Sequence, residues 1–139
     1  MLVRVAVGVL VLLGAIVIAV VLERRRRRHT MPVRDSYPTP RQLFRADFTR
    51  PEAPWLVALF SSRTCDGCAS MREKVKVLES DEVAVCDVEF QDQRALHERY
   101  EISGVPMVLV ADAEGVVRKS FIGSTSATDL WAAVADLRA

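Results

Sequence analysis

The stretch Thr64-Cys65-Asp66-Gly67-Cys68 carries two cysteines separated by two residues. It follows the apolar run Trp55 to Phe60 and precedes a run with helical periodicity, Ala69 to Leu78. A continuous apolar run of this length predicts a central strand buried on both faces. One turn of the following helix brings the two sulfurs within reach of each other, and the N-terminus of that helix favours a thiolate at Cys65. Strand, turn, Cys-x-x-Cys and helix is the arrangement that thiol–disulfide exchange requires.

The net charge conceals a division between the two ends of the chain. The 139 residues carry 19 Lys and Arg, 18 Asp and Glu and a formal net charge of +1. Six basic residues, Arg4 and Arg24 to Arg28, and one acidic residue, Glu23, precede His29, which leaves 13 basic and 17 acidic residues and a net charge of −4 from there onward. The length predicts one domain with a modest core, and its mildly acidic balance argues against nucleic acid as a partner.

An apolar segment near the N-terminus predicts a membrane anchor. Val5 to Leu22 is uncharged, and as a helix it would extend about 27 Å, close to the hydrocarbon thickness of a bilayer. The alternatives are a cleaved signal peptide, whose apolar region is shorter, and a buried core helix, which is not apolar on every face. Arg24 to Arg28 predict contact with anionic lipid head groups and, by the positive-inside rule, a cytoplasmic domain after them.

We therefore expect an anchor at residues 1–23, a basic juxtamembrane segment and linker at residues 24–38, and a folded domain at residues 39–139. The stretch Thr39 to Gln42 predicts a helix start, because threonine can cap, proline suits the first helical position and glutamine completes a capping box. Leu43, Phe44 and Phe48 would form the apolar side of this short helix.

The rest of the domain alternates between strand and helix patterns. Further strands are predicted at residues 83–88, 107–111 and 116–121, with a turn at residues 112–115. Further helices are predicted at residues 92–100 and from Ser126 onward, with Asp129 as the acid of a capping box. Strands that alternate with helices and then end in a hairpin predict a mixed sheet with helices on both faces.

Residues 39–139 resemble a thioredoxin-family domain. Four features carry the resemblance: the strand that runs into Cys65-Asp66-Gly67-Cys68, the tetrapeptide Gly104-Val105-Pro106-Met107 before an apolar strand, Gly115 in the hairpin turn, and Gly123 after it. The resemblance implies an α/β fold with a central mixed sheet flanked by helices, which here follows one predicted transmembrane helix.

The resemblance also implies roles for individual residues. Cys65 matches the attacking cysteine of the family and Cys68 the resolving one. Pro106 matches the family's cis-proline, which turns the backbone so that Val105 presents its N–H and C=O to a substrate strand. The alternative for Pro106 is an ordinary loop proline at the start of a strand. Thr64 falls on the same docking surface.

The motif departs from the family's usual Trp-Cys-Gly-Pro-Cys. Thr64 replaces the tryptophan and removes an apolar part of the docking surface. Gly67 replaces the proline and makes the first helical turn less rigid. Asp66 places a negative charge beside Cys65 and disfavours its thiolate, an effect that Arg63 is expected to offset in part.

A second departure concerns proton transfer. Thioredoxins carry a buried aspartate six residues before the first cysteine, where this chain has Leu59. The lysine that accompanies this aspartate falls near Val85. With both positions apolar, we expect no base near Cys68, and hence a slower or more specialised domain than a general thioredoxin.

Three other residues are assigned structural roles. Cys86 lies in a strand pattern and is expected to be a buried thiol. His97 lies among charges in a helix and is expected to be a solvated surface residue, and Trp131 is expected to pack in the core or on a helix face. A zinc site needs about four ligands, and the spacing of the cysteines and histidines does not supply them, so we expect no metal and no other cofactor.

The sequence thus predicts a membrane-anchored thiol–disulfide oxidoreductase in which Cys65 attacks protein disulfides and Cys68 resolves the mixed disulfide. Its partners would be protein disulfide or dithiol substrates, an unidentified electron donor or acceptor, and membrane lipid at residues 1–28. The alternative is a binding or adaptor module with little turnover that holds a partner strand at Val105 and Pro106. The apolar residues at positions 59 and 85 keep this alternative open.

Overall fold

The computed structural model describes residues 14–19 and 37–139. Residues 14–19 form an exposed helical segment. In this described part of the chain, no helix is both long and apolar enough to cross a membrane. Most of the predicted anchor at residues 1–23, and nearly all of the linker at residues 24–38, lie outside the described residues. By its contacts the chain divides into two compact units, Met1–Arg34 and Asp35–Ala139.

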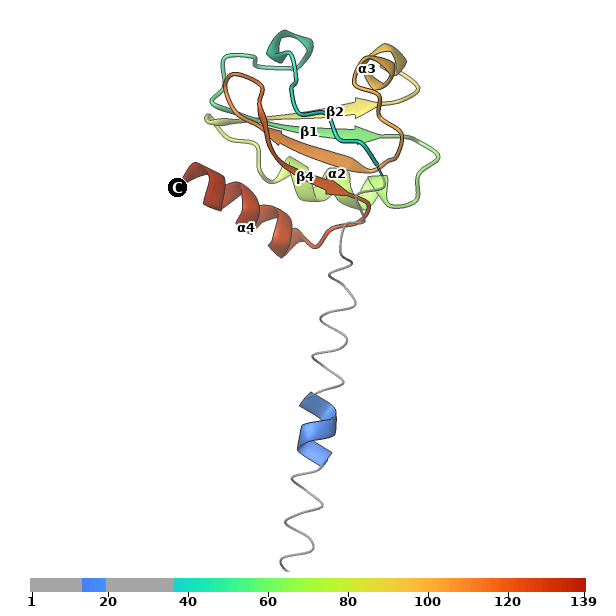
Figure 1. Ribbon diagram of the computed structural model, residues 1–139, viewed down its shortest axis with the longest axis vertical. Helices are drawn as coiled ribbons and strands as arrows, with labels where there is room; N and C mark the ends of the chain where they lie inside the picture. Colours follow the sequence, from blue (N-terminus) through green and yellow to red (C-terminus); the bar gives the residue numbers. More distant parts are fainter. Residues whose placement is uncertain (1–13, 20–36) are drawn as a thin grey trace, which may run out of the picture. The chain divides into compact units, whose positions relative to one another are not determined.

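Residues 37–139 form a four-stranded mixed sheet with helices on both faces, as predicted (Figure 1). The strand order is β2-β1-β3-β4; β1 is parallel to β2 and antiparallel to β3, and β4 is antiparallel to β3. The elements, in chain order, are the 3-10 helix η1 (Arg45–Asp47), β1 (Trp55–Ser61), α2 (Cys68–Lys76), β2 (Val83–Glu89), α3 (Arg94–Arg99), β3 (Met107–Ala111), β4 (Val117–Ile122) and α4 (Ala127–Arg138). All four strands and the three longer helices lie where the sequence predicts them.

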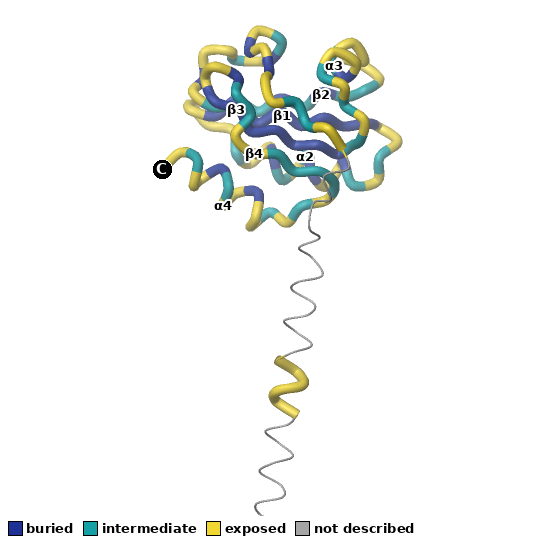
Figure 2. The backbone as a smooth tube through the Cα atoms, in the orientation of Figure 1, coloured by how far each residue is buried: buried dark blue, intermediate teal, exposed yellow. Residues whose placement is uncertain are grey.

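Each face of the sheet has its own core. η1 and α3 cover one face, and α2 and α4 cover the other (Figure 1). Alternate residues of β1 point to opposite faces. Leu56, Ala58 and Phe60 therefore join the core beneath η1 and α3, whereas Val57 and Leu59 join the core beneath α2 and α4. β1 and β3 are the most completely buried strands of the sheet (Figure 2).

The helix predicted to start at Thr39 is wrong. Residues 39–42 are not helical, and Gln42 forms an isolated antiparallel bridge with Val116. The side chain of Gln42 donates to the Glu114 carbonyl (2.7 Å) and does not close a capping box. Gly115 has a φ of +80°, and a Cβ atom there would lie 2.0 Å from the Leu43 carbonyl oxygen. Pairing with the hairpin, which the local sequence does not reveal, overrides the helix signal.

The C-terminal helix follows the prediction. The Ser126 hydroxyl accepts a hydrogen bond from the N–H of Asp129 (3.1 Å) and caps α4. Trp131 is 40 % exposed, and its indole N–H donates to the Lys74 carbonyl (2.9 Å), so it packs on a helix face and joins α4 to α2. These contacts hold α4 beside the helix that carries the second cysteine.

Candidate active site

The Cys-x-x-Cys motif forms a tight turn between β1 and α2. The N–H of Cys65 donates to the Ser62 carbonyl (3.2 Å), and the N–H of Cys68 donates to the Cys65 carbonyl (3.3 Å). Gly67 caps α2, and Cys68 is its first helical residue. Because a glycine cap has no side-chain acceptor, the first N–H groups of α2 contribute their partial positive charge to the region of the cysteines.

The two motif cysteines are joined in a disulfide and differ in exposure. Their Cα atoms are 5.5 Å apart. Cys65 is half-buried, whereas Cys68 is 1 % exposed. A substrate can therefore reach the first sulfur far more easily than the second, which is the asymmetry expected of an attacking and a resolving thiol. Cys86 is a free and buried thiol in β2, as predicted. In residues 14–19 and 37–139, no group of three His, Cys, Asp or Glu side chains could hold a metal ion.

The cis-proline loop lies against the motif. The Val105–Pro106 peptide bond is cis, which is the geometry that the resemblance implies for Pro106. A Cβ atom on Gly67 would lie 3.8 Å from ring atoms of Pro106, which places the proline ring beside the motif. The Pro106 carbonyl accepts from the N–H of Gly123 (2.8 Å), whereas the N–H and C=O of Val105 have no backbone partner among the described residues. Val105 is thus free to pair with an incoming strand.

Two residues beside this loop were not predicted. A Cβ atom on Gly104 would lie 3.5 Å from the ring of Tyr37, whose side chain is 48 % exposed. A Cβ atom on Gly67 would lie 2.8 Å from the Ser124 hydroxyl. Only the position of Ser124, directly after Gly123, offered a sequence signal. Tyr37 lay in the segment taken as linker, and nothing in the local sequence links it to Gly104.

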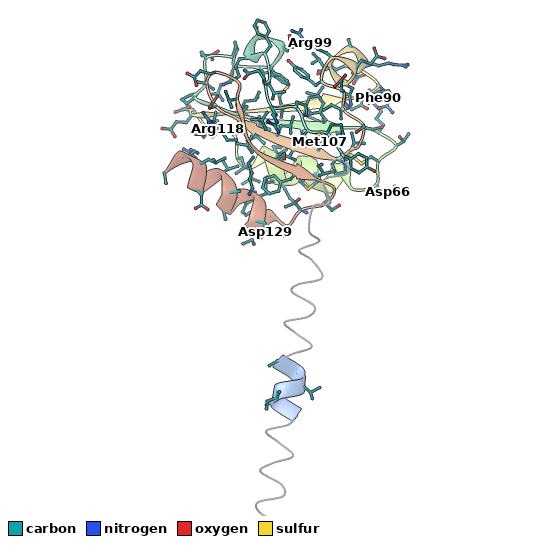
Figure 3. All side chains as sticks on the ribbon, in the orientation of Figure 1. Asp66, Phe90, Arg99, Met107, Arg118 and Asp129 are labelled. Carbon is teal, nitrogen blue, oxygen red and sulfur yellow. A yellow bond between two sulfur atoms is a disulfide. The ribbon has the colours of Figure 1, made fainter. Side chains whose placement is uncertain are left out.

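The charged side chains at the exposed edge of the motif have other partners than the sequence suggested. Thr64 and Asp66 are both exposed, and Asp66 lies at the edge of the domain in Figure 3. The guanidinium of Arg63 pairs with Asp92 (2.6 Å) and Glu89 (3.2 Å). The hydrogen bond and the charge of Asp92 raise the pKa of Arg63. We expected Arg63 to offset the negative charge of Asp66. Among the described residues, Arg63 instead forms its ion pairs with Glu89 at the end of β2 and with Asp92 in the loop after it.

The buried position before the motif has an unexpected neighbour. Leu59 is fully buried in an apolar cluster, as predicted. Its partner on β2 is Asp87, however, while Val85 is paired with Val57. The Asp87 carboxylate accepts hydrogen bonds from Ser61 (2.6 Å) and from the Arg72 guanidinium. Positions 59 and 85 are thus both apolar, as predicted, but Asp87, on the same face of β2 as Val85, places an unpredicted carboxylate opposite Leu59.

His97 is not a surface residue. It is 3 % exposed, its Nε2 is 2.8 Å from the Val88 carbonyl, and its ring lies edge-on to Phe60 (5.1 Å) and Phe90 (5.2 Å). α3 is only one and a half turns long, so one face of it packs fully on the sheet, and the charged neighbours of His97 in the sequence occupy the other. The histidine is a structural residue on the face opposite α2.

A family model for thioredoxin matches residues 37–136. The chain belongs to the thioredoxin family. The comparison with curated proteins gives no match. Solved thioredoxin structures share the fold, among them a mutant from Halobacterium salinarum (22% identity, TM-score 0.54, 62% of this chain and 76% of that one) and the germline-specific thioredoxin Deadhead of Drosophila melanogaster (23%, 0.55, 63% and 84%). The oxidized mitochondrial thioredoxin 3 of Saccharomyces cerevisiae is another (18%, 0.52, 62% and 81%).

Within the thioredoxin fold, the predicted site residues come together at one end of the two central strands, β1 and β3. Cys65 and Cys68 lie at the carboxyl end of β1, and Pro106 lies beside them at the start of β3. The motif departs from the usual thioredoxin sequence at Asp66 and Gly67, and both positions are at or near the surface. The disulfide, with its half-buried first cysteine, and the unpaired Val105 backbone lie on the two segments that meet at Gly67 and Pro106.

Proposed function

We propose that this protein is a membrane-anchored thiol–disulfide oxidoreductase that acts on protein disulfides. The observation that carries the proposal is the disulfide between Cys65 and Cys68 beside the cis-proline Pro106, with the first sulfur accessible and the second buried. The disulfide is the oxidised form of the site, which the reaction cycle leaves behind when a substrate is reduced.

The reduced protein begins the cycle. The Cys65 thiolate attacks one sulfur of a substrate disulfide, and the other substrate sulfur leaves as a thiolate that takes a proton from water. The N-terminus of α2 stabilises the attacking thiolate. Asp66 opposes it, so this thiol is less acidic than one with a neutral neighbour in the same turn.

Resolution completes the cycle. Cys68 releases its proton and attacks the sulfur of Cys65, and the second substrate sulfur leaves. Two electrons pass from the dithiol to the substrate, and the protein is left with the disulfide that the structure contains. A separate dithiol donor must reduce it again before the next turnover.

The backbone of Val105 supports a polypeptide as the substrate. An extended polypeptide can pair with the N–H and C=O of Val105 as a short strand. Tyr37 adds an exposed aromatic ring beside Gly104, the residue before Val105, and this ring could contact such a substrate. A disulfide within a flexible peptide segment meets both requirements.

The test exploits the difference between the two cysteines. Cys68→Ser should leave Cys65 able to attack but unable to release, so it should capture substrates as mixed disulfides that a reducing agent dissolves. Cys65→Ser should capture few or none. The readout is the set of reductant-sensitive conjugates of each variant in cells.

An adaptor gives the opposite pattern. Both variants would hold the same partners, binding would survive a reducing agent, and changes at Val105 or Pro106 would weaken it most. If Cys68→Ser captures nothing while Cys65→Ser keeps reductant-resistant partners, the oxidoreductase proposal is wrong and the binding module replaces it.

The cellular setting belongs to the same proposal. The uncharged segment of residues 5–22 supports a single-pass anchor, and Arg24 to Arg28 support lipid contact and a domain on the cytoplasmic side. In the cytoplasm thiols are kept reduced, so the expected direction is reduction of substrate disulfides.

A reporter fusion tests this topology. A phosphatase that is active only outside the cytoplasm, fused after Ala139, should be silent. A strong phosphatase signal would contradict the cytoplasmic location and would turn the expected direction towards disulfide oxidation or isomerisation.

A further inference from the structure

A polar cluster lies between α2 and the sheet. Ser61 Oγ donates to Asp87 Oδ1 (2.6 Å), Arg72 Nε donates to Asp87 Oδ2, and Arg72 Nη2 donates to Ser61 Oγ (3.3 Å). Ser61 is fully buried, and the side chains of Asp87 and Arg72 are 28% and 38% exposed. Each of the three side chains therefore bonds both of the others, on a face of the sheet that is otherwise apolar.

The cluster adjoins the second cysteine. Arg72 follows Cys68 by four residues in α2, so the two side chains are neighbours on one side of the helix, with Cβ atoms about 5–6 Å apart. Helical side chains lean towards the helix N-terminus, which directs Arg72 towards Cys68. Ser61 is the last residue of β1, and the turn that carries the motif follows it directly. Through Arg72 and Ser61, the cluster is therefore linked to both elements that flank the motif, one helical turn from Cys68.

Resolution requires that Cys68 lose its proton, and Leu59 offers no polar atom for this task. We propose that Arg72, Asp87 and Ser61 form a charge-balanced cluster that sets the pH at which Cys68 becomes nucleophilic. Arg72 favours the Cys68 thiolate, Asp87 opposes it, and Ser61 helps to fix the geometry of the pair. All three are positioning residues, since they act on the sulfur through charge. The inference rests on the proposed oxidoreductase function.

The other charged groups near the motif are engaged elsewhere. Glu89 on β2 is paired with Arg63, and Lys74 on α2 donates to the Thr125 carbonyl (2.8 Å). Asp66 is exposed. The two loops that pack against the motif, residues 105–106 and 123–125, carry no charged side chain. Arg72 and Asp87 are therefore the charges that should dominate the environment of Cys68.

The experiment separates attack from resolution. The full chain in detergent micelles is reduced and mixed, in excess, with an aromatic disulfide whose thiolate product is coloured. The first release of colour reports attack by Cys65, the second reports resolution by Cys68, and the second rate is measured against pH. Asp87→Asn should lower the midpoint of this profile and Arg72→Gln should raise it, each by on the order of one pH unit.

The opposite signs distinguish charge coupling from a structural role. Asp81→Asn removes an exposed carboxylate before the start of β2 and is the matched control, which should leave the midpoint unchanged. Midpoints that move in the same direction, or stay in place in folded variants, overturn the inference. If Asp87→Asn does not fold, the midpoint of Arg72→Gln decides the test. If the unaltered chain shows no first release of colour, the proposed function itself fails, so the two failures are distinguishable.

Discussion

The two faces of the sheet differ in the partners of their polar side chains. On the face covered by η1 and α3, the buried side chains of His97 and Arg45 bond backbone carbonyls. His97 bonds the Val88 carbonyl, and Arg45 Nη1 donates to the Asp112 carbonyl (2.9 Å). Burial lowers the pKa of Arg45 by more than its acidic neighbours raise it. These hydrogen bonds offset the cost of burying the two side chains, although Arg45 Nε has no partner among the described residues.

On the face covered by α2 and α4, the partners are themselves ionisable or polar side chains. Asp87 is bonded by Ser61 and Arg72. A backbone carbonyl has one charge state, whereas a carboxylate and a guanidinium create a field that a nearby thiol senses. His97 and Arg45 therefore stabilise the fold, whereas the partly exposed pair of Asp87 and Arg72 on the second face is the one that our inference links to the chemistry of Cys68.

The largest expected effect on this comparison comes from His97→Ala. Removing the ring leaves a cavity between Phe60 and Phe90 and an unpaired carbonyl, so the free energy of unfolding should fall by about 2–4 kcal/mol. Urea denaturation measures it, and Glu98→Ala, at an exposed site on the same helix, should change it by less than about 0.5 kcal/mol. If His97→Ala shifts the pH profile of resolution as far as Arg72→Gln does, the polar groups of the two faces do not differ in role.

An intermediate effect on stability is expected from Asp112, which lies at the hairpin on the face covered by η1 and α3. Burial alone would raise the pKa of Asp112, but hydrogen bonds from Arg118 and from the Val116 N–H outweigh it, and the pKa is lowered. A lowered folded-state pKa contributes stability above the unfolded value of about 4, and this stability is lost as the pH falls through the folded value. Asp112→Asn should cost about 1 kcal/mol at neutral pH.

The same variant has a signature in acid. The stability of Asp112→Asn should fall less steeply than that of the unaltered chain below pH about 4. Urea denaturation at a series of pH values measures the slope, with Asp136→Asn, at an exposed position of α4, as the control. Equal slopes in all three proteins would show that Asp112 does not contribute to acid unfolding.

The smallest expected effect concerns substrate docking. Tyr37→Ala should raise the KM for a peptide disulfide about three- to tenfold with little change in kcat, because an aromatic contact of about 0.5–1.5 kcal/mol is lost in binding. Tyr37→Phe should restore the KM, since the ring provides the contact. Phe44→Ala, which removes another exposed aromatic at the N-cap of η1, is the control. If the KM of Tyr37→Ala is unchanged, the ring does not contribute to substrate docking.

Local sequence patterns predicted most of the fold. Apolar runs placed the strands, and the capping box at Ser126 placed α4, because these signals depend on neighbours in the chain. The helix expected at Thr39 failed because Gln42 is paired with Val116, far away in the sequence. The prediction that His97 is a surface residue was wrong for a related reason. The local sequence of a short, charged helix does not indicate that one of its residues faces a sheet.

The residues of the candidate site also divide into those that local motifs predict and those that only the folded structure brings together. Cys65, Cys68 and Pro106 could be named from their motifs. Asp87 could not be recognised as the neighbour of Leu59, because the register of two parallel strands is set by packing and not by either strand alone. Tyr37 and Gly104 meet only in the folded domain.

The segment of residues 37–43 has a mechanical consequence. Tyr37 lies on Gly104 beside the docking strand, and the segment then joins the hairpin through the Arg41 carbonyl and the Leu43 N–H. A pulling force applied on the N-terminal side of Tyr37 is borne first by its contact with Gly104 and then by the bonds to Gly115 and to Val117 at the start of β4. β1 is paired on both sides, with β2 and with β3. Tension would therefore separate Tyr37 from Gly104 while the strand that leads to Cys65 stays paired.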